Sequence, residues 1–238
     1  MAEPDRTVKR FWKIVSLEQG SFGHGLRLDG KTVHTPQRNE LVLPTLALAE
    51  AVAAEWDAVD GDIDPAKMPM TGFANAAIDK IKPDRDAFVD AIAAYGETDA
   101  FCYRADAEDA LSERQALIWD PWLDWARARY DVSFTIVNGI MHQPQPEATL
   151  AALKIAVAAR GTFELAAMTK LAHLSGSLVA VLALVERAGD AVALWRACCL
   201  EELWQEELWG EDHWAQKNRL DREVEFMAAA HFLDLLHI

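Results

Sequence analysis

The stretch FWKIVSLEQGSFGHGLRLDGKTVHTP, residues 11–36, decides the fold class of this chain. Apolar and polar residues alternate along FWKIVSLE and again along LRLDGKTVHTP, with the two-residue period of strands that bury one face. Asp29 and Gly30 interrupt the second run as a two-residue hairpin turn, because this pair readily adopts the positive φ angles that such turns need. One more short strand is expected at residues 41–43. The sequence therefore predicts a small antiparallel sheet near the N-terminus.

Helical patterns replace the strand pattern after this sheet. The first predicted helix begins at Thr45 and ends near Trp56, before the turn-rich segment DAVDGDIDP. Residues 101–103 are expected to form a further short strand. Beyond them, Asp120 and Pro121 indicate an N-cap and the first residue of a helix, PWLDWARARY.

Helical periodicity then continues almost to the C-terminus. Helices are predicted at residues 147–159, 163–174, 177–188, 191–209 and about 212–236. The last of these carries an apolar face formed by Leu220, Val224, Met227, Ala228, Phe232 and Leu235. We therefore expect an α+β protein, in which a small N-terminal antiparallel β domain with short helices, residues 1–105, precedes a larger, mostly α-helical domain, residues 106–238.

The composition restricts the classes of partner. Of 238 residues, 23 are Lys or Arg and 38 are Asp or Glu, so the formal net charge is -15 at pH 7. Such a charge repels phosphate backbones and anionic lipids, which argues against nucleic acid as a partner. Membrane insertion is not expected either, because the longest apolar run, residues 178–185, is far below the roughly 20 residues that span a bilayer. The N-terminal MAEPDRTVKRFWK resembles neither a secretory signal nor a transit peptide.

Known motifs for catalysis, cofactors and metals are missing from the sequence. It has no glycine-rich nucleotide loop, no HExxH zinc motif, no GxSxG nucleophile elbow and no EF-hand loop. The seven histidines are scattered, and Cys102, Cys198 and Cys199 form no CxxC pair, so no zinc site is indicated. We expect no catalytic residue, cofactor or metal site, although paired carboxylates such as Glu201 and Glu206 leave acid–base chemistry open.

The segment EELWQEELWGEDHW, residues 201–214, is the strongest candidate for a functional surface. On one continuous helix, Trp195, Glu202 and Trp209 recur at seven-residue spacing on the face opposite Leu200. Large aromatic rings around a carboxylate are typical of a protein-binding surface. A helix packed between two layers of its own domain would show the same pattern, so both interpretations stay open.

Two carboxylates of this segment fall on the core side of that helix. Glu207 and Glu211 lie near the direction of Leu200. A buried carboxylate without a partner is costly, so we expect them either beyond the packed region, near a helix end at Gly210, or beside a cation such as Arg196.

Five segments, in order along the chain, carry a family resemblance: TGFANAAID at 71–79, TDAFCYRA at 98–105, RQALIWDPWLDWA at 114–126, GSLVAVLAL at 176–184 and EELWQEELWGEDHWA at 201–215. Together they resemble the ATP-twelve family of ATP synthase assembly chaperones. The resemblance implies a non-enzymatic chaperone that binds the free alpha subunit of the F-type ATP synthase catalytic sector and prevents its aggregation until a beta subunit replaces it. It also implies a β domain followed by a helical domain, and a bacterial member that works in the cytoplasm.

The resemblance further implies roles for particular residues. Its acidic and aromatic motif falls on Glu201, Glu202, Gln205, Trp209 and Gly210, which we expect to bind the partner together with Trp195. Structural roles are expected for Trp56 and for the WDP motif, which falls on Trp119, Asp120 and Pro121.

Two other functions stay open from the residues alone. One is a small-molecule enzyme that uses a helical carboxylate cluster in a deep pocket. The other is a helical adaptor with unrelated clients. A monomer is expected, although the sequence does not determine the oligomeric state.

Overall fold

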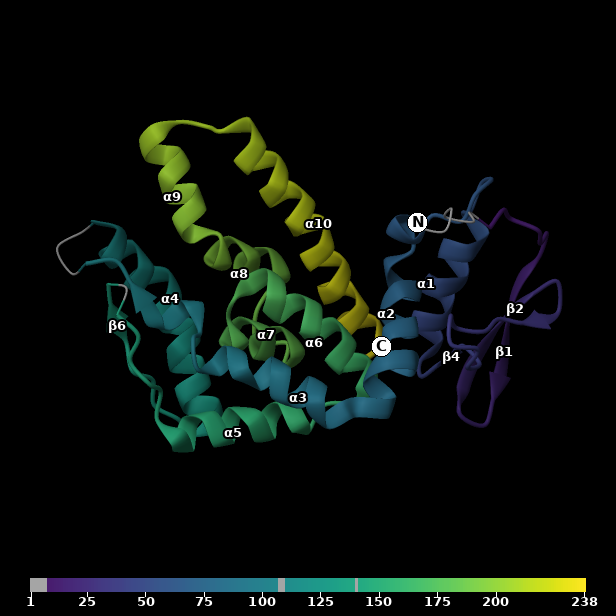
Figure 1. Ribbon diagram of the computed structural model, residues 1–238, viewed down its shortest axis with the longest axis horizontal. Coiled ribbons are helices and arrows are strands. Elements are labelled where there is room, and N and C mark those ends of the chain that lie inside the picture. The colour runs from purple at the N-terminus through teal and green to yellow at the C-terminus, as the bar shows by residue number, and fades with distance from the viewer. Residues whose placement is uncertain (1–7, 107–109, 140) are drawn as a thin grey trace, which may run out of the picture. The chain divides into compact units, whose positions relative to one another are not determined.

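The computed structural model describes residues 8–106, 110–139 and 141–238 (Figure 1). Its contacts divide the chain into two compact units, one of Met1–Asp84 with His231–Ile238 and one of Arg85–Ala230. Residues 1–7, which are part of the segment searched for targeting features, lie outside the described part of the chain.

The first unit contains an antiparallel sheet, as the alternating pattern predicts. Its strands are β1 (Val15–Gly20), β2 (Gly23–Leu28), β3 (Lys31–Thr32) and β4 (Val42–Leu43). β2 is central, because β1 pairs along one side of it, and β3 and β4 pair along the other. The predicted hairpin turn has positive φ angles at Asp29 and Gly30, 49° and 79°. The Asp29 carboxylate also accepts hydrogen bonds from the amides of Lys13 and Ile14, at 3.0 and 2.9 Å, which fixes the start of β1.

Two helices complete the core of the first unit, α1 (Leu46–Asp57) and α2 (Pro69–Ala76). Thr45, where the helix was predicted to begin, is the N-cap of α1, because its hydroxyl oxygen accepts a hydrogen bond from the amide of Leu48. The last residues of the chain belong to this unit: the ring centroid of Phe232 lies 5.1 Å from that of Phe73, and the Thr45 hydroxyl donates to the carbonyl of Leu235 at 2.6 Å. The apolar core is formed by residues such as Leu26, Leu43, Leu48, Val52, Met70, Ala74 and Ile81.

The second unit is mostly helical, and the α+β prediction is confirmed. Its helices are α3 (Arg85–Ala93), α4 (Ala110–Tyr130), α5 (Glu147–Ala158), α6 (Thr162–Ser175), α7 (Leu178–Val185), α8 (Ala191–Cys198), α9 (Leu200–Trp209) and α10 (His213–Leu235). The last five residues of α10, from His231 onward, belong to the first unit. Two short strands, β5 (Tyr103–Arg104) and β6 (Val137–Asn138), pair in parallel. The strand predicted at residues 101–103 is displaced, because Ala100–Cys102 forms a 3₁₀ turn.

α7 is the centre of this helical unit. All of its residues are buried, and Ser177 caps it by accepting a hydrogen bond from the amide of Ala180. The fully buried carboxylate of Asp99 accepts hydrogen bonds from the amides of Phe101 and Val179, at 3.0 and 2.8 Å, and burial raises its pKa to about 6. Because these bonds tie the segment before α4 to α7, the units divide at Asp84 and Arg85, not at the predicted residues 105 and 106.

Pro121 does not begin a helix, contrary to the prediction. α4 begins at Ala110, so Pro121 lies inside it and Asp120 is not an N-cap. The Asp120 carboxylate instead accepts a hydrogen bond from Arg104 Nη2 at 2.6 Å. A proline in a helix leaves the carbonyl four residues earlier without its usual donor. That carbonyl belongs to Leu117, which is 76% exposed, so water can replace the missing donor.

Two further helix predictions are wrong. The helix predicted at residues 191–209 is divided at Cys199, whose φ and ψ of -93° and 10° separate α8 from α9. On α10, the predicted apolar face is buried only in part, because its residues Leu220 and Val224 are 53% and 70% exposed. The residues of α10 that are buried are Arg219, Phe226, Ala229, Ala230, Phe232, Leu233 and Leu235.

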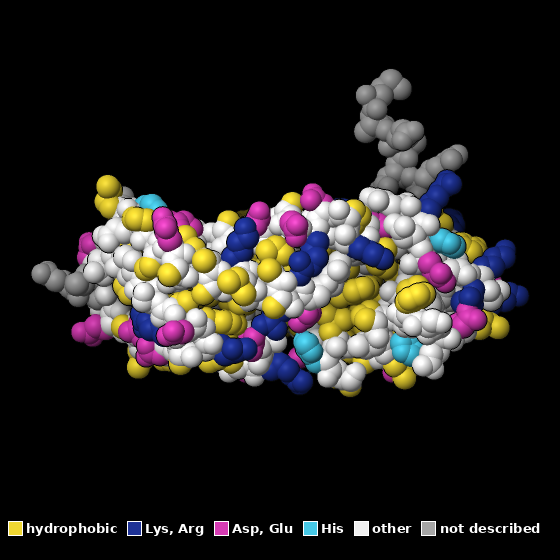
Figure 2. Space-filling view, turned by 90° about the horizontal axis from the view of Figure 1, so that it is seen from below, with side chains coloured by type: hydrophobic (Ala, Val, Ile, Leu, Met, Phe, Trp, Pro, Cys, Tyr) yellow, Lys and Arg dark blue, Asp and Glu magenta, His cyan; other side chains and the backbone are white. Residues whose placement is uncertain are grey.

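Charged side chains of both signs are distributed over the surface. On the face shown in Figure 2, acidic and basic groups are interspersed among apolar side chains, so the negative net charge is not gathered in one block there. Within the described residues, no helix combines the length and the apolar character needed to cross a membrane.

Candidate partner-binding site

The predicted functional segment forms α9 and the turn into α10. Gly210 ends α9 with a φ of 87°, an angle that favours glycine. Asp212 then starts α10, because its Oδ1 accepts hydrogen bonds from the amides of Trp214 and Ala215 at 2.8 and 2.9 Å. Figure 1 shows α9 and the beginning of α10 joined by this turn. The exposed part of the segment is therefore presented at a helix–turn–helix tip.

Two ion pairs join α9 to α10. Glu202 accepts from Arg222 Nη2 with both carboxylate oxygens, at 2.6 and 2.7 Å. One turn further along α9, Glu206 accepts from Arg219 Nη2 at 2.8 Å, and these two side chains are only 17% and 10% exposed. Both carboxylates are thus engaged by arginines of the same unit, and the pairs fix the position of α9 against α10.

A second set of polar contacts joins α9 to α4. Arg114 donates to both carboxylate oxygens of Glu207, at 2.5 and 2.9 Å, and this lowers the pKa of Glu207. Glu201 accepts a hydrogen bond from Nε2 of the buried Gln115 at 2.7 Å. Glu207 therefore lies beside a cation, which was one of the two expectations for it. The cation is Arg114 and not Arg196.

Trp195 does not lie on an exposed face, contrary to the prediction. It is 2% exposed, its ring centroid lies 5.1 Å from that of Phe226 on α10, and the Arg222 guanidinium lies 5.7 Å from its ring. The seven-residue spacing with Glu202 assumed one continuous helix, but the break at Cys199 gives α8 and α9 different faces. Trp195 belongs to the core of the second unit.

The exposed aromatic groups gather at the end of α9. Trp209 is 77% exposed, and the neighbouring Leu208 and Trp214 are 56% and 74% exposed. We call these three residues the aromatic tip. Gln205 and Gly210 are also exposed, and no atom lies within 4 Å of the position that a Cβ at Gly210 would take. Large apolar groups that are exposed within one short segment are typical of interaction surfaces.

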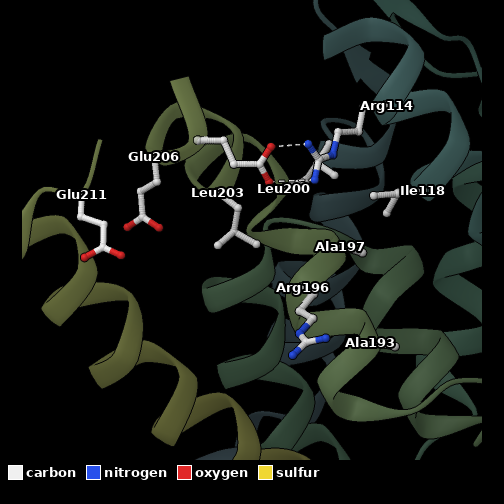
Figure 3. A pocket seen from close by; sticks show the side chains of 10 residues that line it. Arg114, Ile118, Ala193, Arg196, Ala197, Leu200, Leu203, Glu206 and Glu211 are labelled. Atoms are coloured by element: carbon white, nitrogen blue, oxygen red, sulfur yellow. Dashed lines mark hydrogen bonds and ion pairs between the residues drawn. The ribbon is translucent and has the colours of Figure 1, made fainter. Parts of the chain in front are cut away.

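A cavity of about 580 Å³ lies beside this segment, between α4, α8 and α9. Figure 3 shows Arg114 and Ile118 on one side of it, Glu206 and Glu211 on the other, and Leu203 between them. The remaining lining residues are Ala193, Arg196, Ala197, Leu200 and Glu207. The cavity thus has an apolar floor and a rim with charges of both signs.

The residues expected to be structural are packed within their units. The indole nitrogen of Trp119 donates to the carbonyl of Ala197 at 2.7 Å, and its ring stacks on Phe101 with centroids 5.5 Å apart. Trp56 on α1 lies against Trp12, with centroids 5.2 Å apart. These contacts support structural roles for both tryptophans.

The arginines that hold α9 were missed by reasoning from the sequence. A signal for them exists: Glu202 and Glu206 are four residues apart on one helix, and Arg219 and Arg222 are three apart on the next. Such spacings place each set on one helix face, so an antiparallel pair of helices can match the charges. The exposed Trp214 was not singled out within its segment. On one continuous helix, Leu208 was expected on the core side with Leu200, but it is 56% exposed.

The side chains of the described residues offer little for metal or thiol chemistry. Among them, no group of three or more His, Cys, Asp or Glu residues is arranged to hold a metal ion. Burial raises the pKa of Cys199 to about 12 and that of Cys198 well above its usual value, so both thiols stay protonated.

Comparison with known proteins gives a consistent result. The family model described as ATP12 chaperone protein matches residues 9–127. Atp12 from Paracoccus denitrificans is 37% identical, with a TM-score of 0.92 over 96% of this chain and 98% of that chain. An aspartate-to-lysine mutant of the Paracoccus protein gives the same identity and score over 96% and 97%. A candidate chaperone from Agrobacterium tumefaciens is 36% identical, with a TM-score of 0.91 over 96% and 86%. The chain belongs to the ATP12 chaperone family.

Proposed function

We propose that this protein is an assembly chaperone that binds the unassembled alpha subunit of the F-type ATP synthase catalytic sector and prevents its aggregation before a beta subunit associates. The observation that carries the proposal is the aromatic tip, in which Trp209 and Trp214 are 77% and 74% exposed at the end of a braced helix. Tryptophan is the residue type most enriched among the dominant contacts of protein interfaces. Membership of a chaperone family makes an unassembled subunit the natural partner.

The bracing of α9 favours this use of the tip. Arg114 and Arg222 hold the helix from two sides through bidentate ion pairs with Glu207 and Glu202. A surface fixed before binding loses little conformational freedom when the partner arrives, so a small number of apolar contacts can give useful affinity. Because the client must be handed on, an interface near the standard size of about 1,600 Å² suits the task better than an obligate one.

The cavity beside α9 is compatible with this function and favours it over catalysis. A general acid or base needs a pKa near the working pH. The ion pair with Arg114 moves the pKa of Glu207 downward, away from that range. We therefore interpret the cavity as part of the client-binding surface, where Leu200 and Leu203 can receive an apolar side chain.

We further propose that the protein acts as a monomer in the bacterial cytoplasm. A net charge of -15 opposes association of two copies and approach to anionic membranes. The cysteines at 102, 198 and 199 are free thiols, which suits a reducing compartment.

The test is to mix the purified protein with isolated alpha subunit or isolated beta subunit and to follow co-elution by size-exclusion chromatography. We expect co-elution with alpha alone. In parallel, denatured alpha subunit is diluted with and without an equimolar amount of the protein, in the absence of nucleotide and metal, while light scattering is recorded. Scattering that is not reduced, together with absence of co-elution, would refute the proposal.

A further inference from the structure

β1 (Val15–Gly20) is an edge strand of the sheet in the first unit. The amide of Asp29 donates to the carbonyl of Ile14 at 2.9 Å, so Ile14 is a hydrogen-bonded position of the β1–β2 ladder. Such positions recur at every second residue of an antiparallel pair, so Ser16 and Glu18 also direct their backbone groups toward β2. The residues between them direct their N–H and C=O groups away from β2, and we call them the open-edge residues: Val15, Leu17 and Gln19.

The open-edge residues have no backbone partner on their outer side among residues 8–106, 110–139 and 141–238. Proteins usually protect such an edge with proline, a bulge, an unpaired lysine or a very short strand. β1 has none of these protections. It extends over six residues, VSLEQG, which include no proline and no lysine, and its pairing with β2 runs from Val15 to Gly20 without a bulge. Its single charge, Glu18, is paired with Arg27 of the neighbouring β2. An edge left open in this way can accept another strand.

Apolar surface accompanies the open backbone groups. Phe11 and Ile14 precede the strand and are 70% and 64% exposed, and Phe22 in the hairpin turn that follows is 94% exposed. A surface hollow of about 410 Å³ lies where the start of the strand meets α1. The lining residues of this hollow are Lys13, Ile14, Val15, Ala53, Ala54 and Asp57. The short side chains of the two alanines leave room for an apolar side chain of an added strand, since alternate residues of such a strand point to that face.

We propose that β1 accepts an extended, apolar segment of the client as an additional strand. The inference rests on the proposed function, since the segment is part of the unassembled subunit. Main-chain hydrogen bonds to the open-edge residues would supply affinity with little dependence on sequence, and the hollow beside Ala53 and Ala54 would select apolar side chains. A second copy of this chain is the less suitable occupant, because two copies that each carry a net charge of -15 repel each other. Burial of an aggregation-prone strand in this manner would also explain how the protein keeps its client soluble.

Amide hydrogen exchange resolved to single residues gives a direct test, with the isolated alpha subunit as the probe. In the free protein, the amides of Leu17 and Gln19 should exchange quickly, whereas those of Ser16 and Glu18 should be protected by β2. On addition of the alpha subunit, exchange at Leu17 and Gln19 should slow by about tenfold or more, with little change at the other two. Protection of Leu17 and Gln19 already in the free protein would overturn the inference, because the edge would not be open.

A backbone substitution tests the same point independently. Gln19→Pro removes an outward N–H without removing a bond to β2, and proline is tolerated at such edge positions. The control is Gln19→Ala, which removes the same side chain and keeps the N–H. We expect Gln19→Pro to weaken binding of the alpha subunit by about tenfold while Gln19→Ala binds like the wild type, with equal melting temperatures for all three proteins.

The outcomes separate this inference from the proposed function. If the alpha subunit binds but exchange at Leu17 and Gln19 is unchanged and Gln19→Pro binds normally, the edge-strand inference is wrong and the chaperone function stands. If the alpha subunit does not bind at all, both are wrong. If sedimentation shows a dimer that Gln19→Pro dissociates, the edge pairs with a second copy, and the inference is again overturned. Should Gln19→Pro melt at a lower temperature than Gln19→Ala, the exchange measurement alone decides.

Discussion

Replacing Trp209 with alanine should separate client binding from stability. Trp209 is 77% exposed, so of the about 200 Å² that a tryptophan can bury, folding covers only about 50 Å². At about 25 cal/mol per Å², Trp209→Ala should therefore lower the free energy of unfolding by about 1 kcal/mol at most. In a complex that covers the rest of the ring, the same substitution should weaken binding by about 2 kcal/mol or more, which is about 30-fold in Kd.

The matched control is Trp195→Ala, which removes the same side chain from the preceding helix. Trp195 is 2% exposed and packs on Phe226, so its removal leaves a cavity in the core of the second unit. Loss of a buried tryptophan costs about 3–5 kcal/mol of unfolding free energy. We expect this variant to melt at a much lower temperature than Trp209→Ala.

The assay combines urea unfolding of each variant with titration of the isolated alpha subunit by isothermal calorimetry. We expect opposite rankings in the two measurements. Trp195→Ala should be the less stable variant, and Trp209→Ala should be the weaker binder at a temperature where both are folded. Wild-type affinity of Trp209→Ala would show that the aromatic tip does not contact the client. Loss of several kcal/mol of stability in Trp209→Ala would show instead that the ring is packed in solution.

Three further substitutions test separate features of the structure. Trp56→Arg places a charge against Trp12 and should lower the free energy of unfolding by about 3 kcal/mol, measured by urea unfolding, whereas an unchanged melting temperature would mean that the ring is not a packing contact. Glu202→Lys places a second cation beside Arg222 and should lower the free energy of unfolding by only about 1 kcal/mol, because the side chains of Glu202 and Arg222 are both more than a third exposed. The double variant Glu202→Lys with Arg222→Glu exchanges the two charges and should restore that free energy. Burial raises the pKa of Asp99 to about 6, above the usual 3.8, so this carboxyl adds stability below about pH 4 that is lost as the pH rises through 6. Relative to Asp99→Asn, which does not titrate, the wild type should therefore lose about 2 kcal/mol of unfolding free energy between pH 4 and pH 6.5, and a difference independent of pH would contradict the raised pKa.

Much of the fold could be predicted from local patterns. The alternation along β1 and β2, the turn at Asp29 and the cap at Thr45 are each encoded within a few residues, and the structure shows all of them. The predictions that were wrong concern features that depend on contacts between segments far apart in the sequence. Pro121 is a good first residue of a helix in isolation, but the structure begins that helix at Ala110. The domain boundary was misplaced for a similar reason, since the bonds of Asp99 to α7 cross about eighty residues of sequence.

At the candidate site, too, features encoded by neighbouring residues could be predicted, whereas contacts with distant segments could not. Its segment was recognised from its composition, and Trp209 is exposed as the helix pattern predicts. Trp195 was misassigned because the break at Cys199 changes the direction of its side chain, and no residue nearby signals that break. The cation beside Glu207 was sought on α8, but Arg114 comes from a helix 93 residues away in the sequence.

The ion pairs change how the acidic residues of this segment should be understood. Glu202 was expected to meet a partner directly, yet it already accepts two hydrogen bonds from Arg222, whose guanidinium in turn lies over the ring of Trp195. A direct role would require the client to compete with an intramolecular pair, and breaking that pair would cost part of the binding energy. A supporting role requires no such competition: the carboxylate orders Arg222, and the two together keep α9 in the position that exposes Trp209. The two roles predict different client affinities for the double variant with exchanged charges. That variant restores the ion pair between positions 202 and 222 but reverses the charge at position 202. Recovery of both stability and client affinity would mean that Glu202 acts by fixing the position of the aromatic tip. Recovery of stability alone would mean that the client contacts the negative charge of Glu202 directly.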